Sequence, residues 1–74
     1  MSTREVTVRQ LEVLRAHVRA GTKGAAYCLG LAPSTVSGHL ARIRVKLDVV
    51  TTEQAVYLLT ARGVLVVDLG DAAA

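Results

Sequence analysis

The sequence contains no Phe and no Trp, so any hydrophobic core has to be built from Leu, Val, Ile and Ala. Its single cysteine, Cys28, excludes an intrachain disulfide, and this scarcity is typical of a reducing cytoplasm. No apolar run is long enough to cross a bilayer, and residues 1–8 carry charges in place of a secretory signal. We therefore expect a cytoplasmic protein without membrane contact, formed by a single domain over residues 1–74 with its core at about 6–65.

The chain also lacks the residue sets that catalysis and metal binding require. The glycines at 21 and 24 do not have the spacing of a phosphate-binding loop, and the few acidic residues are scattered. Cys28, His17 and His39 lack a paired cysteine and a fourth ligand, so they do not predict a zinc site. We expect no enzyme, no metal and no cofactor, and we expect Cys28 to be buried as a small apolar residue.

Negative charge is scarce in the first two-thirds of the chain. Residues 1–47 hold eight of the nine Lys and Arg but only two of the six Asp and Glu, a net charge of +6. Residues 48–74 hold Arg62 against four acidic residues, a net charge of −3. A small domain with such a basic body most often faces nucleic acid, although the charges also serve simply to keep a small apolar protein in solution.

Helix signals predict an all-α domain of four helices. Thr7-x-x-Gln10 and Thr51-x-x-Gln54 are capping boxes, and Pro33 suits the first turn of a helix. The predicted helices cover about residues 8–20 with Gly21 as the stop, a two-turn segment between Thr22 and Gly30, residues 33–47, and residues 52–62 with Gly63 as the stop. We expect a short aliphatic tail at residues 64–69 and disordered ends at 1–5 and 70–74.

The third predicted helix has two different sides. Val36, Leu40, Ile43 and Leu47 recur at helical spacing and predict a buried stripe, whereas three cations lie among the other positions. A short helix, a glycine-containing turn and a long helix predict a helix-turn-helix, whose second helix would be free to enter a DNA major groove.

On these residues the chain resembles the LuxR/GerE-type helix-turn-helix domain of bacterial response regulators and quorum-sensing activators. The family's opening pattern, LTxRExEVL, is matched by VTVRQLEVL at residues 6–14, with Gln10 in place of the usual Glu. Its recognition-helix pattern, STVxxHLxxIxxKLxV, is matched by STVSGHLARIRVKLDV at residues 34–49. The resemblance covers about residues 6–65. It implies a DNA-binding domain with the third helix as recognition helix.

The resemblance also implies three groups of contact residues. The residues expected to read bases are Val36, Ser37, Gly38, Ala41 and Arg42. The residues expected to contact phosphates are Arg9, Lys23, Ser34, Thr35, His39, Arg44 and Lys46, where the alternative for His39 is a half-buried side chain that only packs. The residues expected at a homodimer seam on the fourth helix are Val56, Tyr57, Leu59 and Thr60, unless the tail covers this surface.

Departures from the family pattern leave two functions open. Ser37 stands where the family often has Lys, and the small side chains at 37, 38 and 41 leave Arg42 as the best guanine reader. Part of the specificity would then come from DNA shape and from thymine-methyl contacts of Ala41 or Val36. The segment after Gly21 is also two residues shorter than usual, and no regulatory domain accompanies the chain, which is either free-standing or an excised fragment. The alternative to a homodimeric reader of double-stranded DNA is a module that binds RNA polymerase or a larger regulator through the fourth helix and the tail.

Overall fold

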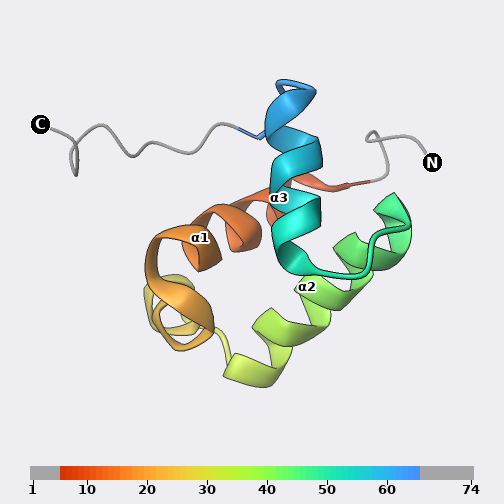
Figure 1. Ribbon diagram of the computed structural model, residues 1–74. Helices are drawn as coiled ribbons and strands as arrows, with labels where there is room; N and C mark the ends of the chain where they lie inside the picture. Colours follow the sequence, from red (N-terminus) through yellow and green to blue (C-terminus); the bar gives the residue numbers. More distant parts are fainter. Residues whose placement is uncertain (1–5, 66–74) are drawn as a thin grey trace, which may run out of the picture.

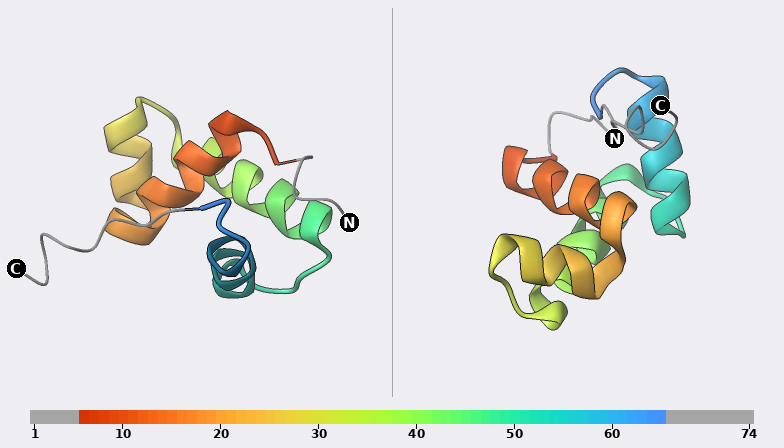
Figure 2. Two further views of the ribbon diagram at one scale, coloured as in Figure 1. Left: turned by 90° about the horizontal axis from the view of Figure 1, so that it is seen from above. Right: turned by 90° about the vertical axis from the view of Figure 1, so that its left-hand side faces the viewer.

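The computed structural model describes residues 6–65, which form three helices and no strand (Figure 1). The helices are α1 (Val8–Leu29), α2 (Pro33–Leu47) and α3 (Thr52–Ala61). Helices α1 and α3 both pack against α2 and leave its other side uncovered (Figures 1 and 2). The expectations for residues 1–5 and for the tail beyond position 65 lie outside the described residues. Within these residues, no helix combines the length and the apolar character needed to cross a bilayer.

The prediction of four helices is wrong, because residues 8–29 form the single helical element α1. Its first arm (residues 8–20) and its second arm (residues 22–29) meet at Gly21, whose φ of 74° and ψ of −179° are not helical. Figure 2 shows the bend between the two arms, and the helix resumes directly after Gly21 without a loop. Gly21 is therefore the only residue between the two arms. The Thr22 hydroxyl lies 3.4 Å from His17 Nδ1, across this bend.

The ends of the helices follow the local signals. Both predicted capping boxes are confirmed. The backbone N–H of Gln10 donates to Thr7 Oγ1, and the backbone N–H of Gln54 donates to Thr51 Oγ1, each at 3.1 Å. Helix α2 begins at Pro33 without a side-chain cap. Helix α1 ends at Gly30, whose left-handed backbone lets the Leu31 amide donate to the Ala26 carbonyl at 2.9 Å. Helices α1 and α2 are thus joined by a short turn.

The hydrophobic core lies where the three helices meet. The anchoring stripe of α2 (Val36, Leu40, Ile43 and Leu47) is buried, as its spacing predicts. It packs against buried residues of both neighbouring helices and of the segments next to them, namely Val6, Val13, Leu14, Ala25, Ala26, Ala55, Leu59 and Leu65. Cys28 is exposed, so its predicted burial is wrong. It belongs to the outer side of the second arm, where it lines a groove with residues of the first arm.

Two polar contacts connect α2 to its neighbours. Lys46 Nζ donates to Gln10 Oε1 at 3.1 Å, and this oxygen also accepts the Thr7 amide at 3.1 Å. Arg44 Nη1 donates to Thr52 Oγ1 at 2.8 Å. Gln10 is the one buried polar residue in the described part of the chain, and these hydrogen bonds satisfy its carbonyl oxygen. The C-terminal end of α2 is therefore fixed to the beginnings of α1 and α3.

Candidate nucleic-acid interface

The uncovered side of α2 carries a second stripe, opposite the anchoring stripe. This outer stripe consists of Ser34, Gly38, Ala41 and Val45. Each member precedes a buried residue by two positions, which is about 200° around a helix. Three of the four side chains are small, and the fourth, Val45, is 74% exposed. The helix therefore presents three small residues and one exposed valine on this side over about three turns.

The predicted base-reading residues differ in their burial: two are exposed, two are half-buried and one is buried. Ser37 and Arg42 are exposed, and Gly38 and Ala41 lie half-buried on the outer stripe. The exposed fraction of Val36 is 0%, because it belongs to the anchoring stripe. Its assignment to base reading and to a thymine methyl conflicts with this burial, so Val36 is left out of the interface. The signal was present in the sequence, since the same residue was also predicted to anchor the helix.

The cations near the C-terminal end of α2 form hydrogen bonds within the fold and are also partly exposed. Arg44 and Lys46 make the contacts to Thr52 and Gln10 described above. Both acceptors are neutral oxygens, which orient the cationic groups. Arg42, in contrast, makes no hydrogen bond or ion pair with residues 6–65 and is exposed. Arg42 is the cation of α2 most available to an outside partner.

Three further predicted phosphate contacts lie at the start and near the middle of α2. At the start of α2, Ser34 and Thr35 are exposed, but the Thr35 amide already donates to the Ala32 carbonyl at 3.0 Å. The backbone N–H of Ser34 is therefore the group that could donate to an anion there, and the positive end of the helix dipole favours an anion at this position. His39 is half-buried, and its Nδ1 atom is buried without a hydrogen-bond partner in the described structure.

Two further predicted phosphate contacts lie on α1. Lys23 is exposed on the second arm, and Arg9 is exposed on the first arm, where it forms a 4.0 Å ion pair with Glu12. An exposed pair at this spacing contributes little and leaves the arginine able to exchange partners. These two cations extend positive charge beyond α2.

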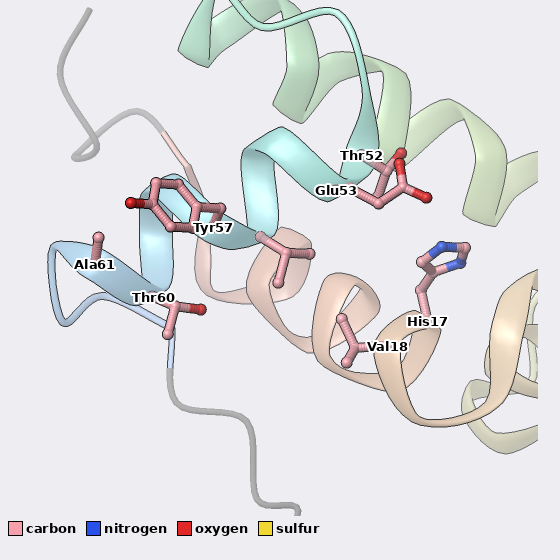
Figure 3. A pocket seen from close by; sticks show the side chains of 8 residues that line it. His17, Val18, Thr52, Glu53, Tyr57, Thr60 and Ala61 are labelled. Atoms are coloured by element: carbon pink, nitrogen blue, oxygen red, sulfur yellow. The ribbon is translucent and has the colours of Figure 1, made fainter.

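Three of the four predicted dimer residues, Val56, Tyr57 and Thr60, line a groove between α1 and α3 (Figure 3). The groove has a volume of about 630 Å³ and is lined by His17, Val18, Thr52, Glu53, Val56, Tyr57, Thr60 and Ala61. Tyr57 is 76% exposed and Thr60 is exposed, so both are accessible to a partner. Leu59 has an exposed fraction of 0% and packs in the core, so its assignment to a dimer seam conflicts with its position.

Among residues 6–65, no three His, Cys, Asp or Glu side chains come together in a way that could hold a metal ion. Sequence reasoning missed Val45, although the spacing of residues 38, 41 and 45 places it on the same outer stripe as two predicted base readers. No protein-family model matches the chain, and neither a curated protein nor a solved structure matches it.

Proposed function

We propose that the chain is a sequence-specific transcription regulator that binds double-stranded DNA by inserting α2 into the major groove. The observation that carries this proposal is the contrast between the two stripes of α2. One stripe is buried in the core with residues of α1 and α3, while the opposite stripe consists of half-buried or exposed residues and is flanked by Arg42 and other cations. A helix of this kind fits a groove of about 12 Å width whose walls carry phosphates. The action of such a regulator in the cytoplasm remains a prediction.

In this proposal one group of residues contacts base edges and a second group contacts phosphates. Ser37, Gly38, Ala41 and Arg42 face base edges, with Arg42 pairing with guanine through its planar guanidinium. Arg9, Lys23, Ser34, Thr35, His39, Arg44 and Lys46 supply phosphate contacts around them. A homodimer forms through Val56, Tyr57 and Thr60 of α3, and its two-fold symmetry implies an inverted-repeat site.

Selection from random-sequence duplex oligonucleotides at two salt concentrations tests the proposal. We expect an enriched inverted repeat, with an affinity that falls steeply as salt rises, because phosphate contacts release counterions. Enrichment of a single half-site would contradict the homodimer and leave the DNA reader in place. Binding without enrichment would reduce the function to attraction by the DNA backbone, and the absence of binding at low salt would overturn DNA binding itself.

Arg42→Ala is expected to weaken binding to the enriched sequence by roughly 5- to 150-fold per half-site, the range for loss of one bidentate base contact. Binding to an unrelated duplex should fall far less. Arg62→Ala is the matched control, since Arg62 is an exposed arginine at the end of α3, away from α2. Fluorescence anisotropy with both duplexes measures the two affinities. An equal loss on both duplexes would make Arg42 a phosphate contact.

Gly38→Ala separates the stability of α2 from its binding. Gly38 has an ordinary helical backbone, and an added Cβ would meet no atom within 4 Å beyond its chain neighbours and the adjacent backbone of α2. The fold therefore gains from alanine, and we expect the free energy of unfolding to rise by about 1 kcal/mol, as for glycine-to-alanine changes within helices. If DNA approaches the helix closely at this point, affinity for the enriched sequence should fall several-fold despite the added stability. Thermal unfolding and anisotropy on the same variant test this, and unchanged affinity would show that DNA does not pack against Gly38.

The groove between α1 and α3 favours a second candidate function, docking to RNA polymerase or to a larger regulator. The groove combines the exposed Tyr57 with the half-buried Val18 and Val56, a mixture suited to a protein partner. This function becomes the better explanation if the purified chain retains no DNA in the selection at low salt. Sedimentation of the free chain then shows whether a second copy already fills the groove.

A further inference from the structure

The outer side of α2 has a small hollow toward its C-terminal end. The outer hollow is lined by Ala41, Arg42, Val45 and Lys46 and has a volume of about 260 Å³. Two of these residues, Ala41 and Val45, are apolar members of the outer stripe. The other two, Arg42 and Lys46, are long side chains that combine an aliphatic stem with a charged end. The result is an apolar depression between two cations.

Packing within the chain does not account for Val45. Its side chain is 74% exposed and lies opposite the anchoring stripe, so the core gains nothing from it. Valine is also a weaker helix former than Ala, Leu, Lys or Glu, which suit an exposed helix position better. A single exposed valine is ordinary on a protein surface. Val45, however, lines an apolar hollow on the same stripe as Gly38 and Ala41, and this position indicates a contact with a ligand.

We infer that the outer hollow receives the C5-methyl group of a thymine in the major groove and that Val45 is a specificity-determining residue. The inference rests on the proposed DNA-binding function and adds a base identity to it. Charge complementarity selects a polyanion as the occupant, because the hollow is bordered by Arg42 and Lys46. Base edges in the major groove carry hydrogen-bond donors and acceptors, and the thymine methyl is their one apolar group. An apolar hollow facing that groove therefore selects thymine.

The position of the thymine follows from helix geometry. Val45 lies seven residues after Gly38, which corresponds to about 10 Å along the axis of α2. For a helix aligned with the DNA axis, that length corresponds to about three base-pair steps of 3.4 Å. We expect the thymine about three base pairs from the position that Gly38 approaches, toward the side of the site contacted by the end of α2.

Parallel selections with thymidine and with deoxyuridine libraries test the inference, because uracil differs from thymine by the methyl group alone. The proteins are the wild-type chain, Val45→Thr and the control Val50→Thr. Threonine keeps the branched shape of valine and replaces one methyl group by a hydroxyl. Val50 is 84% exposed and lies beyond the end of α2, so it reports the general effect of losing an exposed apolar group.

With the wild-type chain, one position in each half-site of the enriched sequence should be thymine, and uracil there should weaken binding about fourfold per half-site, the value of one buried methylene-sized group. Val45→Thr should bind the thymine duplex about as weakly as the wild type binds the uracil duplex, and it should no longer distinguish the two. Val50→Thr should behave as the wild type.

An enriched sequence without a uracil-sensitive position would overturn the inference and leave the DNA-reading function standing. So would a uracil effect that Val45→Thr does not change, because the methyl contact would then belong to another residue. A selection that enriches no sequence would overturn the proposed sequence-specific function, and the inference with it.

Discussion

Ile43→Ala is expected to lower the free energy of unfolding by about 2–5 kcal/mol, the range for truncating a fully buried aliphatic side chain. Ile43 has an exposed fraction of 0% and lies in the middle of the anchoring stripe, where α1 and α3 both contact α2. Its loss leaves a cavity that three short helices share. A domain of this size buries a limited core, so most of its stability depends on such residues.

Val45→Ala is the matched control, since Val45 lies two residues away on the opposite side of the same helix. We expect its free energy of unfolding to stay within about 0.5 kcal/mol of the wild-type value, as for other surface substitutions. Urea unfolding monitored by circular dichroism measures both variants. Similar losses for Ile43→Ala and Val45→Ala would contradict the assignment of the two stripes, and with it the outward direction of the candidate interface.

Much of this fold is predictable because its signals are local. The capping boxes at Thr7 and Thr51 each involve residues three apart, so the sequence alone identifies where α1 and α3 begin. The anchoring stripe was predictable for a similar reason, because helical spacing places its four members on one side. The same spacing, extended to the other side, also identifies the outer stripe.

The contacts that sequence reasoning missed depend on how the helices are placed in space. The Lys46–Gln10 hydrogen bond joins residues 36 positions apart, and neither residue type predicts the other. Burial was misjudged at Cys28 because its environment depends on the angle between the two arms of α1. Leu59 was placed at a dimer seam because much of its helix is apolar, and only the packing of α3 on α2 shows that this side chain faces inward.

The bend of α1 explains why the number of helices was misjudged. A glycine after a periodic apolar segment normally ends a helix, and a loop then follows. Here Gly21 adopts φ 74° and ψ −179°, a combination that turns the chain within one residue. The second arm then places Ala25 and Ala26 in the core. Glycine is also required at position 24, because a Cβ there would collide with the Cβ of Ala20. The two arms therefore approach each other closely at Gly24, whereas Gly21 supplies the turn between them.

Gly21→Ala is accordingly expected to lower the free energy of unfolding by about 1–3 kcal/mol, because the backbone of Gly21 lies in a region that is essentially restricted to glycine. An added Cβ at this position would meet no other atom within 4 Å, so the loss would come from the backbone and not from a collision. Gly38→Ala is the control, since it makes the same chemical change where the backbone is helical and should instead raise stability by about 1 kcal/mol.

Urea unfolding of the two glycine variants gives the comparison directly. Because the second arm carries Ala25 and Ala26 into contact with the rest of the core, strain at Gly21 should also loosen the packing of α1 on α2. Hydrogen exchange of amides in residues 22–29 should then become faster in Gly21→Ala than in Gly38→Ala. If both variants gained stability, residue 21 would have to adopt an ordinary helical backbone, and α1 would be a straight helix that could not place its second arm beside α2.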